Sequence, residues 1–169
     1  GFKERFSNKT AIAPTASISI ICGGASPGVE PVAANSYTHK TLSGSFNVRN
    51  KYLEKILEKY GKNDEEIWSS ITTNQGSVSH LNFLTQEEKD VFKTAFELDQ
   101  RWIVDLGADR TPYISQAQSI NIFVPADIHK RDLHQIHFQA WKKGLKSLYY
   151  CRSKSIQRAE NVNDTKLTD

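Results

Sequence analysis

The chain has 169 residues, of which 38% are hydrophobic and 24% are charged, a length that suits one domain with a real core. Its net charge of +3 comes from scattered basic residues, which argues against a dedicated nucleic-acid module. No stretch approaches the ~20 apolar residues of a membrane span. The N-terminal GFKERFSNKT has no signal-peptide features, so we expect a cytosolic protein.

Neither the cysteines nor the histidines form a ligand pattern. Cys22 and Cys151 lie far apart and outside any CxxC motif, so we expect reduced, buried thiols. His134 and His137 share a predicted helix but have no carboxylate in register as a third ligand, so we expect no metal site. The chain contains no methionine, even at residue 1, which suggests a fragment of a longer product.

The N-terminal part is predicted to contain a strand, a helix and a hairpin. Residues 10–13 (TAIA) indicate a short buried strand that stops at Pro14. Residues 14–24 (PTASISIICGG) are typical of a tight loop followed by a short buried helix, because Ser and Thr cap helices and glycine suits their C-terminal ends. Residues 36–50 alternate enough to predict a hairpin around Ser43 and Gly44.

Helical patterns follow. Residues 51–60 have apolar side chains at helical spacing, and Asp64 is positioned to cap the next helix. Thr85 begins a capping-box pattern at the start of an amphipathic helix over residues 84–98. We expect residues 99–115 to contain another helix that falters at Gly107 and stops near Pro112.

The C-terminal part is predicted to be a βαβ unit. Residues 118–124 indicate a buried strand, residues 127–145 a long helix with one apolar face, and residues 147–151 (SLYYC) a second strand. Such a unit favours an α/β fold with a parallel sheet. Residues 152–169 are polar and offer little to bury, so we expect a flexible tail.

The first candidate site is the loop from Pro14 to Ser19. A loop of small hydroxyl residues that opens a helix directs free backbone amides and the positive helix end at one point, which suits a phosphate group. Thr15, Ser17 and Ser19 could add hydroxyl donors. An ordinary helix cap explains the same residues, because the loop has neither a Walker lysine nor a GxGxxG pattern.

The second candidate site is the pair Tyr149 and Tyr150. Adjacent side chains on a strand point to opposite faces, so one ring could fill the core while the other reaches water. A redox interpretation is the alternative, because neighbouring phenols can pass a radical by losing an electron and a proton together. That role requires the strand to twist or end at the pair, so that the rings approach each other.

The chain resembles the C-terminal part of the large (alpha) subunit of class I ribonucleotide reductase over residues 8–158. The resemblance is carried, in this order, by NKTAIAPTASIS, ASPGVEP, YISQAQSINIFV and the helix leading into GLKSLYY. The resemblance implies an α/β fold, the C-terminal part of a ten-stranded α/β barrel that is incomplete on its own. Residues 1–151 would belong to this barrel and residues 152–169 to the tail. The implied activity is reduction of ribonucleoside diphosphates to 2'-deoxyribonucleoside diphosphates by radical chemistry.

The resemblance also implies residue roles. Tyr150 would receive the oxidising equivalent from the small (beta) subunit, and Tyr149 would pass it to an active-site cysteine. Neither Cys22 nor Cys151 matches a catalytic motif of the family. The substrate-diphosphate site would consist of Pro14, Thr15, Ala16, Ser17 and Ile18, with Ser19 at its edge.

Other functional groups of the family have no counterpart here. Its thiyl-radical cysteine, its reducing cysteine pair and its allosteric nucleotide sites lie upstream, and its C-terminal cysteine pair is missing from NVNDTKLTD. We therefore expect this segment to need the N-terminal part of the large subunit and the small subunit, which would carry the radical or metal centre. A thioredoxin- or glutaredoxin-type reductant would serve the holoenzyme. The segment itself would bind no metal or cofactor.

Two alternatives remain. The chain could be a phosphate-binding or interaction remnant of the same family that has lost catalysis. It could also be a relative from the cobalamin-dependent class, which has similar barrel motifs. That class needs no relay between subunits, so the tyrosine pair argues against it.

Overall fold

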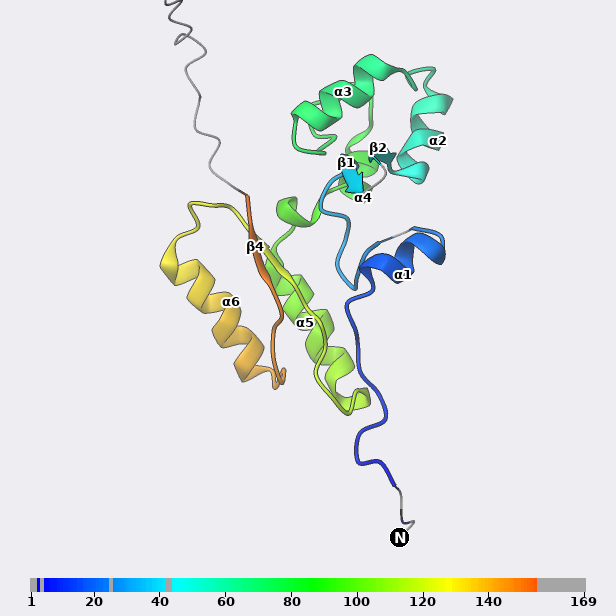
Figure 1. Ribbon diagram of the computed structural model, residues 1–169. Helices are drawn as coiled ribbons and strands as arrows, with labels where there is room; N and C mark the ends of the chain where they lie inside the picture. The colour runs from blue at the N-terminus through cyan, green and yellow to red at the C-terminus, as the bar shows by residue number, and fades with distance from the viewer. Residues whose placement is uncertain (1–2, 4, 25, 42–43, 155–169) are drawn as a thin grey trace, which may run out of the picture.

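The computed structural model describes residues 3, 5–24, 26–41 and 44–154, and Figure 1 shows their arrangement. No helix in these ranges is long and apolar enough to cross a membrane. The elements are α1 (Ala16–Ile21), β1 (Ser36–Thr41), β2 (Gly44–Arg49), α2 (Lys51–Lys59), α3 (Glu65–Thr73), α4 (Gln86–Val91), α5 (Gln100–Arg110), β3 (Ile122–Val124), α6 (Lys130–Lys142) and β4 (Cys151–Ser153), with 3-10 turns at Ala95–Glu97 and Thr111–Tyr113.

The N-terminal segment forms the predicted short helix, but the helix is not buried. Ile12 makes a parallel bridge to Gln118, which is the remnant of the expected strand. Figure 1 shows α1 as a short helix near the N-terminus. Its Ile18 side chain is exposed, and Ile21 is 86% exposed. The expectation of a buried helix is therefore wrong, because no described element covers this apolar face.

The expectation of buried thiols is also wrong. Both Cys22 and Cys151 are free and exposed. Cys22 is the C-cap of the exposed α1, and all residues of β4 are exposed. The position of each cysteine at an uncovered element explains its exposure.

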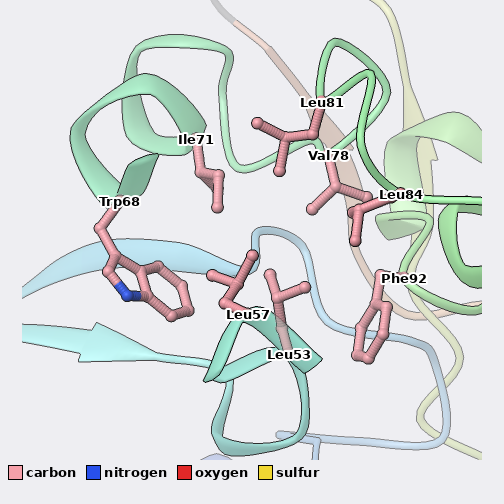
Figure 2. Packing of buried hydrophobic residues seen from close by; sticks show 8 residues of the cluster. All are labelled: Leu53, Leu57, Trp68, Ile71, Val78, Leu81, Leu84 and Phe92. Carbon is pink, nitrogen blue, oxygen red and sulfur yellow. The ribbon is translucent and has the colours of Figure 1, made fainter. Parts of the chain in front are cut away.

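The hairpin and the next two helices surround one hydrophobic cluster. β1 and β2 pair antiparallel with Thr41 opposite Gly44, which confirms the hairpin, although Ser43 lies outside the described residues. The predicted cap is confirmed, since the Asp64 Oδ1 atom accepts the Ile67 N–H at 2.9 Å. Figure 2 shows the side chains of this helical cluster pointing toward one another: Leu53, Leu57, Trp68, Ile71, Val78, Leu81, Leu84 and Phe92.

The capping box at Thr85 and Glu88 is confirmed, but its helix is shorter than predicted. α4 ends at Val91, and a second box begins at Thr94, whose N–H and hydroxyl both donate to the Glu97 carboxylate at 2.8 Å. Thr94 is fully buried. The long amphipathic pattern therefore contains a break where this buried threonine starts a new turn.

α5 runs through Gly107 without interruption, so the predicted faltering is wrong. A Cβ atom at Gly107 would lie 2.5 Å from Ile120 Cδ1 and 3.3 Å from Leu145 Cδ2. The glycine therefore lets α5 approach the segment before β3 closely. The helix contacts both β3 and α6.

The predicted βαβ unit is confirmed. β3 and β4 are parallel neighbours, with Ile122 opposite Cys151, and α6 connects them. All of β3 is buried, as expected for a parallel strand covered on both faces. A second cluster fills this unit: Ile103, Val104, Ile120, Ile122, Val124, Ile136 and Ala140.

Within the described ranges, the parallel sheet contains β3, β4 and the single bridge at Ile12, so it does not close into a barrel. This matches the expected incomplete part of a larger sheet. β4 begins only at Cys151, the last residue of the strand predicted over residues 147–151, and it continues to Ser153, past the predicted domain boundary at residue 151. Residues 155–169 of the predicted tail lie outside the described residues.

Candidate functional site

The tyrosine pair immediately precedes β4 and is tied to the neighbouring strand by its backbone. The Tyr149 N–H donates to the Ile120 carbonyl at 2.8 Å, and the Tyr150 carbonyl accepts the Ile122 N–H at 2.9 Å. Regular strand geometry starts only at Cys151, so the pair lies where the strand begins. The backbone of both tyrosines is thus fixed by hydrogen bonds, although both residues lie just outside the regular strand.

The two rings lie against each other. Their centroids are 4.1 Å apart, their planes are inclined by 55°, and the Tyr149 hydroxyl donates to the Tyr150 hydroxyl at 3.5 Å. The rings are 49% and 53% exposed, so neither fills the core. The hydrogen bond to Tyr150 is the main reason that the pKa of the Tyr149 phenol is raised, and the charge of Arg152 opposes the rise. The geometric condition for radical transfer between neighbouring phenols is met.

Arg152 is a contact of the pair that sequence reasoning missed. Its guanidinium carbon lies 5.4 Å from the centroid of the Tyr150 ring. Residues two apart on a strand share a face, so the spacing of Tyr150 and Arg152 was the available signal.

The loop from Pro14 to Ser19 forms the first turn of α1. The Thr15 side chain makes no capping hydrogen bond and instead donates to the Pro27 carbonyl at 3.3 Å. The Ser19 hydroxyl donates to the Ala16 carbonyl at 2.8 Å. The ordinary side-chain cap considered above is therefore not formed.

This loop leaves donors available. Over the described part of the chain, the amide N–H groups of Ala16, Ser17 and Ile18 have no acceptor, and the Ser17 hydroxyl has no hydrogen-bond partner. Ala16, Ser17 and Ile18 are all exposed. These amides and one hydroxyl could bind an anion that reaches the loop from solvent.

The turn that follows α1 links this loop to β3. Glu30 is only 5% exposed, and its carboxylate accepts the Asn121 N–H in a short hydrogen bond. Because Asn121 lies between the two residues that bond the tyrosine backbone, the segment just before β3 contacts both the tyrosine pair and the turn that follows α1. The sequence analysis did not predict this contact of Glu30.

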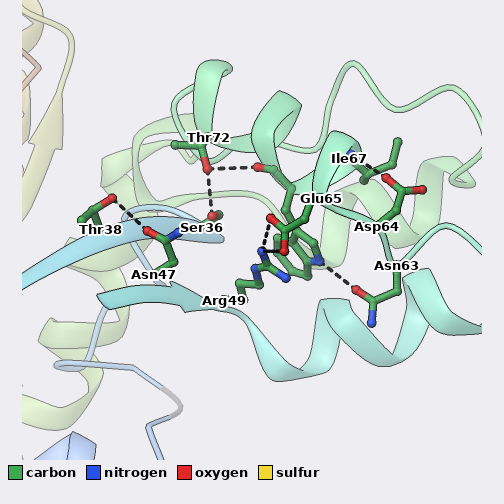
Figure 3. Close-up of polar contacts among 10 residues, drawn as sticks. Ser36, Thr38, Asn47, Arg49, Asn63, Asp64, Glu65, Ile67 and Thr72 are labelled. Atoms are coloured by element: carbon green, nitrogen blue, oxygen red, sulfur yellow. Dashed lines mark hydrogen bonds and ion pairs between the residues drawn. The ribbon is translucent and has the colours of Figure 1, made fainter. Parts of the chain in front are cut away.

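Two cavities lined by described residues involve none of the predicted site residues. A cavity of about 90 Å³ lies beside α5 between Val29 and Trp102. A polar cavity of about 310 Å³ lies between the hairpin and α3. Figure 3 shows that polar side chains near the second cavity bond to one another: Arg49 to Glu65 at 2.6 Å, Ser36 to Thr72 at 2.8 Å and Thr38 to Asn47 at 3.2 Å.

No group of three or more potential metal ligands occurs among the residues with described positions.

The parallel βαβ unit and the incomplete sheet are typical of one part of a larger α/β barrel. A family model described as ribonucleotide reductase, barrel domain, matches residues 4–151, and the chain belongs to this family. It is similar to large subunits of ribonucleoside-diphosphate reductase. That of Invertebrate iridescent virus 6 is 52% identical over 167 residues, which are 96% of this chain and 17% of that protein.

Other relatives agree. The ribonucleoside-diphosphate reductase large chain 2 of Saccharomyces cerevisiae is 39% identical over 86% of this chain and 17% of its own length. The solved structure of the Actinobacillus ureae class Id ribonucleotide reductase alpha subunit has a TM-score of 0.76 and 47% identity, covering 85% of this chain and 26% of that one. The resemblance and the fold class are confirmed, and the chain spans about a sixth to a quarter of these relatives.

Proposed function

We propose that this chain works as part of the large subunit of a ribonucleoside-diphosphate reductase, in which it supplies a substrate-diphosphate loop and a tyrosine relay. Membership of the barrel family supports the reductase assignment. The observation that carries the relay is the contact of the two phenols, with ring centroids 4.1 Å apart and hydroxyls 3.5 Å apart.

In the relay, Tyr150 would be the phenol that the small subunit oxidises, giving up one electron to it and its phenolic proton to water. A hydrogen atom then passes from the Tyr149 hydroxyl to the Tyr150 oxygen. The O–H bond of Tyr149 breaks, that of Tyr150 forms again, and the radical moves to Tyr149. Tyr149 finally takes a hydrogen atom from an active-site thiol, which restores the phenol and leaves a thiyl radical.

In the substrate loop, the amides of Ala16, Ser17 and Ile18 and the Ser17 hydroxyl bind the diphosphate of the substrate. Pro14 and Thr15 shape the entry to the helix, and Ser19 closes its first turn, since the Ser19 N–H donates to the Thr15 carbonyl at 2.8 Å. The free donors at one helix end support this assignment because they favour negative charge.

The assembly needs other components. The remaining part of the large subunit provides the reactive thiol, the reducing cysteines and the sites for nucleotide effectors. The small subunit provides the oxidising centre, and a thioredoxin- or glutaredoxin-type protein returns reducing equivalents to the holoenzyme.

The test replaces each relay phenol by phenylalanine in the assembled reductase. Because Tyr149→Phe or Tyr150→Phe removes only a hydroxyl, we expect turnover to be abolished while the thermal unfolding midpoint stays close to that of the parent. Tyr113→Phe is the matched control, since Tyr113 is 81% exposed and outside the pair. Turnover that persists in both relay variants would remove the tyrosine relay from the proposed function.

A further inference from the structure

Among the residues with described positions, Arg152 places its guanidinium over the Tyr150 ring. Three cationic residues lie near the pair in sequence, but two of them are engaged elsewhere. The Lys146 ammonium donates to the carbonyls of Ile114 and Ser115, and the Lys154 ammonium donates to Gln75 Oε1 at 2.6 Å. Among the described residues, the cation that faces the phenols is therefore Arg152.

The backbone explains this contact. Tyr150 and Arg152 both take part in the pairing with β3, through the hydrogen bond of the Tyr150 carbonyl and the register of Arg152 opposite Phe123. Alternate residues of a strand share one face, so the guanidinium extends over the Tyr150 ring, 5.4 Å from its centroid. This distance lies within the roughly 6 Å over which a cation is attracted to an aromatic face.

The far end of the strand is anchored independently. The Lys154 ammonium lies 4.6 Å from the centroid of the Phe96 ring while it donates to Gln75. Since both partners belong to the segment between α3 and α5, Lys154 ties the end of β4 to a different part of the molecule. The backbone of Arg152 is thus fixed on its N-terminal side by Tyr150 and on its C-terminal side by Lys154. The Arg152 side chain is the part that can change its contact with the tyrosine pair.

We propose that Arg152 is a positioning residue of the radical relay, whose guanidinium holds the Tyr150 ring against Tyr149. This inference rests on the proposed function. Both rings are about half exposed, so packing alone leaves Tyr150 free to turn toward solvent, where its hydroxyl would no longer meet that of Tyr149. A planar guanidinium over the Tyr150 ring opposes this rotation.

The charge of Arg152 has a second consequence. A positive charge beside a phenol stabilises the phenolate and disfavours a cationic ring, so it couples electron loss to proton loss. Arg152 accordingly lowers the pKa of the Tyr149 phenol, against the larger effects that raise it. The contact between Arg152 and the tyrosine pair can therefore be followed by titrating a phenol, without measuring turnover.

The experiment introduces 3-nitrotyrosine at position 149 of the full large subunit, the phenol whose pKa Arg152 lowers, and titrates its visible absorbance. In Arg152→Gln we expect a higher nitrophenol pKa than in the parent, and in Arg152→Lys a value close to it. Arg131→Gln is the matched control, because it removes the same charge from an exposed residue at the start of α6 and should leave the titration unchanged.

Turnover is measured in parallel without the nitro group. We expect Arg152→Gln to lower kcat about two- to fivefold with KM unchanged, the factor by which an exposed cation–π contact favours one arrangement. An unchanged titration in Arg152→Gln, an equal shift in Arg131→Gln, or a shifted titration with unchanged kcat would each overturn the proposal. Since the titration needs no radical transfer, it tests the contact of Arg152 with the phenols even if the relay itself is wrong.

Discussion

At the scale of single residues, the candidate sites depend on which polar atoms are already engaged. The loop from Pro14 to Ser19 has three hydroxyls, but those of Thr15 and Ser19 donate to carbonyls of the chain. Only the Ser17 hydroxyl stays without a partner in the described ranges. Composition treats these hydroxyls alike, whereas local geometry selects one of them as a ligand donor.

We therefore expect Ser17→Ala to weaken substrate binding. Loss of one hydrogen bond to a phosphate oxygen costs about 1 kcal/mol or somewhat more, which raises KM about fivefold. The measurement is steady-state kinetics of the assembled reductase, with Ser45→Ala as the control because Ser45 is exposed on β2. An unchanged KM would mean that the backbone amides bind the phosphate alone.

Gly76 illustrates a different constraint on a single residue. Its φ is +81°, and an added Cβ atom would lie 2.3 Å from Ala34 Cβ and 2.9 Å from the Asn35 amide nitrogen. Gly61 has a similar φ of +64° but open space around it. A comparison of Gly61 with Gly76 therefore separates the free-energy cost of a left-handed backbone from the cost of a steric clash.

We expect Gly61→Ala to lower the free energy of unfolding by about 1 to 2 kcal/mol through its left-handed backbone alone. Gly76→Ala should cost at least about 1 to 3 kcal/mol more, because overpacking against backbone atoms cannot be relieved by rotating a side chain. Urea unfolding of both variants measures the difference. Equal losses would show that the contact with Ala34 relaxes freely.

At the scale of elements, helix ends are set by side-chain caps. Asn50 and Asp64 cap α2 and α3, and the box of Thr85 and Glu88 starts α4. Hydrogen bonding by the Thr85 backbone is the main reason that the pKa of the Glu88 carboxyl is lowered, with smaller contributions from Tyr60 and Lys59 and an opposing effect of desolvation. The cap therefore depends on an ionised carboxylate.

The stability of this element should accordingly depend on pH. A carboxyl whose pKa is lower in the folded state contributes stability above its unfolded pKa and loses it as the pH falls through the folded value. We expect the free energy of unfolding to decrease below about pH 4.3, the ordinary pKa of glutamate.

Denaturant unfolding at a series of pH values measures this decrease in the parent and in Glu88→Gln. The glutamine keeps an acceptor for the Thr85 N–H but cannot titrate, so its curve should be flatter over the same range. A parent and a variant with the same pH dependence would assign the effect to other carboxyls.

At the scale of the whole molecule, two hydrophobic clusters are complete, but several apolar faces are uncovered. Trp102 of α5 is 67% exposed and Trp141 of α6 is 73% exposed, and α1 presents Ile21 to solvent. The parallel sheet also ends in open edges within the described residues. Such surfaces are typical of sites that other polypeptide covers.

We expect the 169-residue chain alone to self-associate in solution. Sedimentation velocity should reveal species larger than a monomer, and addition of the remaining large-subunit sequence should suppress them. Trp102→Gln should reduce the association by removing exposed apolar area. A monomer that unfolds in one cooperative transition would contradict this expectation.

The sequence by itself determined the elements whose causes are local. Caps, helical periodicity and the order strand, helix, strand predicted α2, α3, the start of α4 and the βαβ unit, because each depends on neighbours a few residues away. The runs around PTASIS and SLYY also predicted the family that the comparisons confirm.

Tertiary structure decided what depends on residues distant in sequence. The continuity of α5 through Gly107 follows from its contact with Ile120, and the exposure of α1 follows from the absence of a described element over it. The approach of the two phenols and the guanidinium over Tyr150 depend on the pairing with β3, and the Asn121 N–H donates to the Glu30 carboxylate from a distant segment. Local pattern cannot predict these contacts, because their geometry is fixed only when separate segments pack together.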